Sequence, residues 1–436
     1  MSNANKSFKK FLILWFGEFI SAIGSGLTAF GLGVYVFRLT GKASAMALIT
    51  ILAFFPPLLL GTVAGVLADR YDRRLMMILG DSLSVFGLIY ILICMYMGEA
   101  QLWQICVGVT VSSVFSSLME PAYKATVSDL LSADQFTKAS GLVQIANSAK
   151  YLVSPIIAGY LLAVSNIKLI LIIDICTFFV TVASTLVVKK GIASKKEVEK
   201  KASLITEFKE GWTTLTKSKG VLVLTIVGSF LCFFMGFIQI LSAPMVLAFK
   251  NSSVLGTVET IIALGMLFSS ILIGVLKIKG GYVRILSVSL FGSGLMMMCF
   301  GFKENIIFIG IFGFLFFAML PFANTSLDFL IRTNTDNSVQ GRVWSLIGII
   351  SQLGTVISYA VCGVLADYIF TPMLIDGGAL SGSVGRIIGT GKGRGAAFLI
   401  IIAGILMCIT SVALYNIKSV RKLEKAVKCA ESLDVL

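Results

Sequence analysis

The stretch GTVAGVLADRYDRR, residues 61–74, is the most informative part of this chain. It lies between two apolar segments, 46–67 and 75–97, and each of these is long enough to cross roughly 30 Å of hydrocarbon. The short connection between them carries two aspartates and three arginines, which solvation of a loop does not by itself explain. The two flanking segments predict a membrane protein, and the charges between them indicate a functional loop.

The composition agrees with a membrane protein. Hydrophobic residues make up 57% of the 436 residues, charged residues 13%, and the mean hydropathy is +0.95. A soluble domain carries about 25% charged residues. Since lipid offers no partner to backbone N–H and C=O groups, we expect an all-α membrane protein. Its twelve predicted spans are 11–37, 46–67, 75–97, 102–121, 138–163, 167–188, 221–247, 257–277, 283–301, 305–330, 343–366 and 397–416.

The net charge of +14 is explained by where the basic residues lie. When the N-terminus is placed inside, most Lys and Arg fall on that side of the predicted spans. This asymmetry follows the positive-inside rule and predicts that both termini are cytoplasmic. Contact with membrane lipid therefore accounts for the charge better than nucleic-acid binding does.

The sequence shows no pattern of a metal centre, a disulfide framework or a catalytic site. Histidine is absent, seven of the eight cysteines lie in predicted spans, and no C-x-x-C occurs. No nucleophile–base pair stands out. We therefore expect neither an enzyme nor a bound cofactor, and any proton carrier has to be Asp, Glu or Lys.

A charged segment, 189–219, divides the predicted spans six and six. It holds nine Lys and four Glu, and the apolar residues of 204–215 recur at helical spacing. A helix on the inner membrane surface is expected there. The predicted domains are a six-helix bundle at 1–188, this cytoplasmic linker at 189–219, a second six-helix bundle at 220–416 and a cytoplasmic tail at 417–436.

The two halves show signs of an internal duplication. Pro121 and Pro321 lie near the ends of spans 4 and 10, and each is followed 20 residues later by a glycine, Gly141 and Gly341. Matches in the same order at a constant offset indicate a repeated six-helix unit. We therefore expect two pseudo-symmetric bundles.

Several spans carry a polar face. Positions spaced 3, 4 and 3 residues apart lie on one side of a helix, and in lipid such a side turns toward other helices or water. Hydrogen bonding between helices, without a ligand, is the alternative interpretation. These faces hold Glu18, Ser21, Ser25 and Thr28 in span 1, and Thr110, Ser113, Ser117 and Glu120 in span 4.

Glu18, Lys150 and Asp174 are charged residues that lie well inside spans. An unpaired charge in a membrane is costly, and such residues often mark proton relays. We predict that these three take part in proton coupling, with Glu18 favoured because it shares its face with hydroxyl groups. A fixed ion pair between Lys150 and a carboxylate is the alternative.

The glycine-rich loop 377–395 includes Gly389-Thr-Gly-Lys-Gly-Arg-Gly395. A phosphate-binding loop requires Ser or Thr after its lysine, and here Lys392 is followed by glycine. We therefore expect no nucleotide to bind. The basic residues of this loop are expected to meet lipid headgroups or an anionic ligand at the outer surface.

The pattern Gly65-x-x-x-Asp69-Arg70-x-x-Arg73-Arg74 resembles the loop between helices 2 and 3 of the major facilitator superfamily. The resemblance implies a cytoplasmic gate that stabilises one of two access states. Other segments resemble the bacterial drug- and macrolide-efflux branch, which also includes siderophore exporters. They are Gly24-Ser-Gly-Leu-Thr28, Glu120-Pro-Ala-Tyr123 and Gln340-Gly-Arg-Val343.

Span 5 resembles the antiporter signature of that family at Gly141, Ser154, Pro155 and Gly159. Three family glycines are replaced, by Lys150, Ser154 and Ala158. Serine and alanine still allow close packing, whereas lysine does not. This departure argues against ordinary proton antiport and suggests that Lys150 takes part in coupling or binds an anionic group.

The resemblance implies a proton-coupled exporter of an amphipathic small molecule, macrolide-like or another drug, in the bacterial plasma membrane. Two bundles would rock about a cavity built from spans 1, 4, 7 and 10, in a monomer with lipid, substrate and protons as its partners. The expected cavity residues are Glu18, Ser21, Ser25, Ser113, Ser117, Glu120, Gln239 and Asn324.

Two alternatives stay open. One is a dedicated exporter of an endogenous peptide antibiotic or siderophore. The other is a receptor or assembly factor that transports nothing, against which the duplicated halves and the polar faces argue.

Overall fold

Long apolar helices make up most of the structure, a computed structural model that describes residues 3–131, 135–189, 204–276, 280–336 and 339–424. Within these ranges eleven helical segments are long and apolar enough to cross a membrane, and no strand occurs. They are α1 (Asn3–Thr40), α2 (Ala43–Arg70), α3 (Arg73–Met97), α4 (Leu102–Ser116) with α5 (Met119–Leu130), α8 (Ile167–Lys189), α10 (Lys219–Leu247), α11 (Ser252–Val275), α12 (Tyr282–Phe302), α13 (Ile306–Thr333), α14 (Gln340–Leu365) and α17 (Arg394–Asn416).

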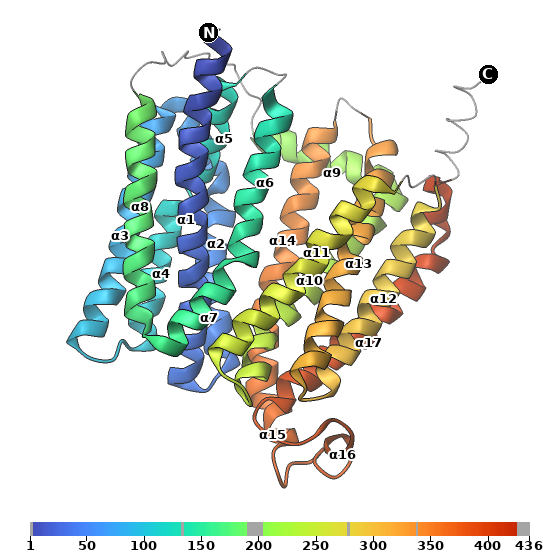
Figure 1. The fold of residues 1–436 in the computed structure, drawn as a ribbon. Coiled ribbons are helices and arrows are strands. Elements are labelled where there is room, and N and C mark those ends of the chain that lie inside the picture. Colours follow the sequence, from blue (N-terminus) through green and yellow to red (C-terminus); the bar gives the residue numbers. More distant parts are fainter. Residues whose placement is uncertain (1–2, 132–134, 190–203, 277–279, 337–338, 425–436) are drawn as a thin grey trace. The chain divides into compact units, whose positions relative to one another are not determined.

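The remaining predicted span, the fifth (138–163), is a pair of shorter helices. α6 (Phe136–Leu152) ends at Val153, and α7 (Ser154–Val164) continues from it (Figure 1). Pro155 causes the break because proline has no backbone N–H to continue the helical hydrogen bonds. It stands in the first turn of α7, where that group is not needed.

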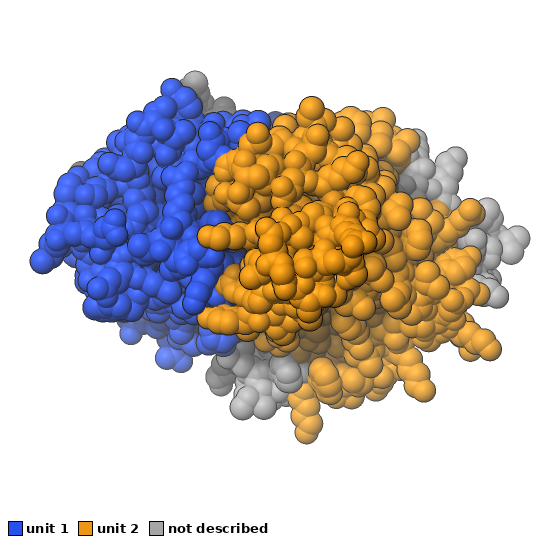
Figure 2. Space-filling model, turned by 90° about the horizontal axis from the view of Figure 1, so that it is seen from below, with its two compact units in different colours: residues 1–199, 251–260 blue, residues 200–250, 261–436 orange. Residues whose placement is uncertain are grey.

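The chain forms two compact units, coloured separately in Figure 2. Unit 1 comprises residues 1–199 together with 251–260, and unit 2 comprises residues 200–250 and 261–436. The predicted linker helix over 204–215 is present as α9 (Leu204–Lys217) and belongs to unit 2.

In unit 1, helix α1 packs on α8 along a line of glycines spaced seven residues apart. A methyl group added at Gly17 would lie 2.3 Å from Ser184 Oγ, one at Gly24 would lie 2.4 Å from Thr177 Oγ1, and one at Gly31 would also meet α8. Small residues at this spacing let two membrane helices approach closely. This contact positions the polar face of α1 in the bundle.

Helices α3 and α4 approach even more closely. A Cβ atom at Gly87 of α3 would lie 2.2 Å from the carbonyl oxygen of Gly108 in α4 and 2.7 Å from the backbone nitrogen of Ser112. Because these are backbone atoms, they cannot rotate away. Glycine at position 87 therefore fixes the separation of the two helices.

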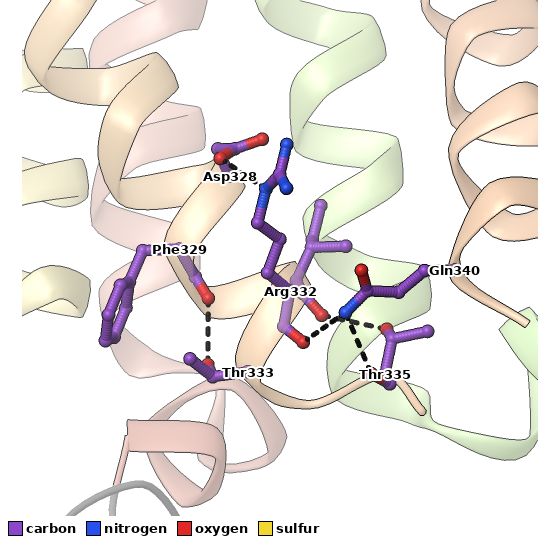
Figure 3. Close-up of polar contacts among 7 residues, drawn as sticks. Asp328, Phe329, Arg332, Thr333, Thr335 and Gln340 are labelled. Atoms are coloured by element: carbon purple, nitrogen blue, oxygen red, sulfur yellow. Dashed lines mark hydrogen bonds and ion pairs between the residues drawn. The ribbon is translucent and has the colours of Figure 1, made fainter. Parts of the chain in front are cut away.

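In unit 2, α9 is held against the beginning of α14. Arg342 Nη1 lies 2.7 Å from Glu210 Oε2, and Gly211 leaves space beside Leu346. Nearby, Gln340 Nε2 donates to the carbonyl oxygens of Arg332 (3.1 Å) and Thr335 (3.2 Å), which closes the turn between α13 and α14 (Figure 3).

The segment before α17 is folded into η2 (Ala366–Phe370), α15 (Thr371–Leu374) and α16 (Val384–Ile388). Arg394 is fully buried at its end, and Nη2 donates to the carbonyl oxygens of Gly301 (2.9 Å) and Phe302 (3.1 Å) at the end of α12. The expectation that this arginine meets lipid or a ligand is therefore wrong. It satisfies carbonyls that the helix end leaves without intrahelical partners.

Candidate functional site

A cavity of about 440 Å³ lies within unit 1. Helices α1 to α6 and α8 all contribute to its wall. Its volume is in the range of small-molecule sites, roughly 300–1,000 Å³. Seven of the residues selected from the sequence line it, namely Glu18, Ser21, Ser25, Ser113, Glu120, Lys150 and Asp174.

The polar face of α1 points into this cavity. Glu18, Ser21, Ser25 and Thr28 all line it, as their helical spacing predicts. Glu18 Oε2 is buried and has no hydrogen-bond partner in the part of the chain that the structure describes. The Glu18 carboxylate therefore retains its capacity to bind a proton or a cation.

Asp174 and Lys150 line the same cavity without forming a close ion pair. Asp174 is 2% exposed, and its Oδ1 accepts a hydrogen bond of 3.3 Å from Thr177 Oγ1. Lys150 lies within electrostatic range of Asp174, but among the described residues its ammonium makes no ion pair within 4 Å. The fixed pair considered from the sequence is thus not seen, and the ammonium of Lys150 is available to a ligand.

Three other sequence candidates are held by contacts within the bundle. Glu120 Oε1 lies 2.6 Å from Lys124 Nζ, and both side chains are exposed. Ser113 Oγ donates to the carbonyl oxygen of Leu52 at 2.8 Å, which joins α4 to α2. Ser117 Oγ donates to Val114 O at 2.6 Å and is not among the cavity residues. Hydrogen bonding within the bundle therefore explains Ser117.

Gln239 and Asn324 lie in unit 2, on α10 and α13, and are not part of this cavity. Both side chains are exposed. The Gln239 side-chain oxygen accepts a hydrogen bond from the Tyr359 hydroxyl of α14. Since this bond uses only the oxygen of the Gln239 amide, it does not involve the two N–H donors of the same group.

Asp81 of α3 is a charged cavity residue that was not predicted from the sequence. Its side chain is 3% exposed, and Oδ2 has no hydrogen-bond partner among the described residues. The Glu18 carboxylate lies within electrostatic range of it. The signal was present in the sequence, because Asp81 is a lone carboxylate well inside the apolar segment 75–97.

Among the predicted gate residues, Arg73 contacts two neighbouring helices. Arg73 connects three helices, since its Nε donates to Ala68 O and its Nη1 to Ala125 O of α5, both at 3.3 Å. Arg74 is buried and Arg70 is exposed.

The structure describes two further details of the gate. The carboxylate that caps α3 belongs to Asp72, which accepts from the Arg74 N–H at 3.0 Å, and the side chain of Asp69 lies outside the described residues. Among the residues that the structure describes, a methyl group at Gly61 or Gly65 would meet nothing within 4 Å.

In the antiporter-like motif, the small residues are sites of close packing. Ser154 Oγ donates to Ile23 O of α1 at 3.0 Å. A Cβ at Gly159 would lie 2.5 Å from Ser252 O, at the beginning of α11, and both residues belong to unit 1. Pro155 is buried, whereas Gly141 is exposed and faces open space.

The fold and a polar cavity inside a helical bundle define a multi-pass membrane transporter. A family model of the Major Facilitator Superfamily matches residues 14–359, and the chain belongs to that family.

Curated relatives include the macrolide efflux protein A of Streptococcus pyogenes, which is 26% identical over 371 residues, 83% of this chain and 90% of the relative. The protein of the same name from Enterococcus faecalis is 26% identical over 322 residues, 71% of this chain and 98% of the relative. Among solved structures, the nucleoside transporter NupG aligns with a TM-score of 0.72 at 11% identity, over 94% of this chain and all of that one. A bacterial homologue of the lysosomal transporter Spinster aligns with a TM-score of 0.71 at 12% identity, over 96% and 98% of the two chains. At 11% and 12% identity, these two solved structures support the fold alone.

Proposed function

We propose that this transporter exports an amphipathic small molecule from bacterial cells by alternating access, driven by protons that move inward. The relatives named macrolide efflux proteins support export of this class of substrate. The two six-helix bundles, 1–188 and 220–416, are the moving parts in this proposal, and the linker 189–219 connects them. The protein would act as a monomer in the plasma membrane with both termini in the cytoplasm.

The unpartnered carboxylate of Glu18 is the observation that carries the proposal. Inside a membrane an uncompensated Asp, Lys or Arg costs about 2.5–3.5 kcal/mol on insertion scales, and a carboxylate at position 18 faces the same penalty. A proton or a cationic substrate removes that cost, and one carboxylate cannot hold both. Competition at Glu18 therefore couples binding of the substrate to release of the proton.

The rest of the cavity suits an amphipathic molecule. Leu88, Val109 and Phe178 supply apolar surface, and Ser21 and Ser25 supply hydroxyls beside Glu18. Apolar walls with a few placed polar groups are typical of sites for drug-sized ligands. An erythromycin-type macrolide joins a basic amino sugar to a large, mainly apolar ring, which matches this division.

Arg73 supports a role for the charged loop as a gate. It links the end of α2, the start of α3 and the carbonyl of Ala125 in α5. Such a link stabilises one arrangement of three helices, and breaking it allows another.

Transport in everted membrane vesicles tests the proposal. With an acidic lumen, wild-type vesicles should accumulate labelled erythromycin, and a protonophore should abolish the accumulation. Glu18→Gln should abolish gradient-driven uptake at the same protein level. Asp328→Asn, which alters an exposed carboxylate outside the cavity, should leave uptake unchanged. Uptake that ignores the pH gradient would contradict proton coupling.

Lys150 favours a second candidate, export of an endogenous peptide or siderophore. Its ammonium makes no ion pair within 4 Å among the described residues and lines the cavity, so it can bind a carboxylate or another anionic group of such a product. Lys150→Met should then abolish export of the native product while erythromycin transport persists. Equal loss of both would argue against this candidate.

A further inference from the structure

Asp81 is a buried charge that no neighbour compensates. It lies on α3 at the cavity wall, is 3% exposed, and has one carboxylate oxygen without a hydrogen-bond partner among the residues described. Isolated carboxylates are excluded from apolar surroundings unless a partner offsets the lost hydration. A ligand in the cavity can be that partner.

The two lysines of the cavity do not take this role. Lys124 is paired with Glu120 at 2.6 Å, and Lys150 lies within electrostatic range of Asp174. No ion pair within 4 Å reaches Asp81 from the described residues. Asp81 and Glu18 thus leave two carboxylates in one cavity without a close cation.

Asp81 also cannot move away from the cavity easily. The preceding residue, Gly80, packs against Phe115 O, where an added Cβ would lie 3.1 Å away. Two turns further along α3, Gly87 is pressed against Gly108. These contacts fix α3 on α4 on both sides of the carboxylate, so its position is set before a ligand enters.

We propose that Asp81 binds the cationic group of the substrate together with Glu18 and makes the cavity selective for organic cations over anions of the same shape. The inference rests on the proposed function, because it names the charge of the exported molecule. Leu88 and Val109, which line the cavity with Asp81, would cover the apolar part of such a cation. Ammonium and phosphonium compounds belong to this class.

Binding to the purified full-length protein in nanodiscs tests the proposal with two probes of equal shape, tetraphenylphosphonium and tetraphenylborate. After subtraction of binding to empty nanodiscs, the wild type should prefer the cation. Asp81→Asn should weaken binding of the cation at least tenfold and leave the anion within threefold. Asp81→Glu should restore most of the affinity, and Asp328→Asn should match the wild type.

A second measurement uses the unaltered protein, in case Asp81→Asn fails to fold. A hydrophobic carbodiimide should modify Asp81, and tetraphenylphosphonium should protect it, as read by mass spectrometry of the peptide. Absence of protection, or a variant that binds the cation as the wild type does, would overturn the proposal even if erythromycin export is demonstrated. Loss of cation binding in Asp81→Asn would support cation binding by Asp81 even if no export is found. In that case only the proposed export function would fail.

Discussion

The contact between α3 and α4 makes a quantitative prediction for Gly87→Ala. The new methyl group would lie 2.2 Å from Gly108 O, whereas ordinary contact begins near 3.4 Å. The helices must therefore separate by about 1.2 Å at this point, and overpacking of this kind typically costs about 1–3 kcal/mol. For a unit of this size, about 2 kcal/mol corresponds to a fall in melting temperature of roughly 4–8 °C.

The matched control is Gly61→Ala in α2. It makes the same chemical change inside a helix, but the added methyl group meets nothing within 4 Å. Alanine is favoured over glycine in helices by up to about 1 kcal/mol, so this variant should melt at the same temperature or higher. The assay is thermal unfolding of the detergent-solubilised full-length protein, followed by intrinsic fluorescence. Equal melting temperatures for the two variants would contradict close packing of Gly87 against α4.

Two further predictions concern unit 2. Arg394→Ala removes two hydrogen bonds from a buried guanidinium to the end of α12. Since hydrogen bonds to charged groups contribute about 1.5–3 kcal/mol each, the melting temperature should fall by more than 5 °C. An unchanged melting temperature would contradict the role of Arg394 in capping α12. Glu210→Ala breaks a half-exposed ion pair with Arg342, which contributes only about 0.2–1 kcal/mol. A double-mutant cycle with Arg342→Ala should give a coupling energy in that range, and a larger value would show that the pair is less screened than its exposure implies.

Much of the fold follows from one physical constraint. Apolar segments of membrane length must be helical, which predicts the spans closely. The division of the fifth span into α6 and α7 was not anticipated, although Pro155 was visible, because hydropathy averages over the break. The close packing of Gly17, Gly24 and Gly31 also went unnoticed, since glycine spacing alone does not identify the helix that it faces.

The candidate site was predicted in part. The face of α1 was identified because its polar residues recur at helical spacing, and seven predicted residues line one cavity. Asp81 was missed because it lacks such a polar stripe, although its charge inside a span was a sufficient signal. Gln239 and Asn324 were assigned from the arrangement that the family resemblance implies, and their place in a substrate cavity stays a prediction.

The central claim is that substrate and proton compete for Glu18. The most direct measurement reconstitutes the purified protein in liposomes with a pH-sensitive dye in the lumen and follows the internal pH when erythromycin is added outside without any gradient. A proton flux opposite to the substrate is expected in the wild type and in Asp328→Asn, and it should be absent in Glu18→Gln. Erythromycin entry with no change in internal pH, or an unchanged proton flux in Glu18→Gln, would contradict it.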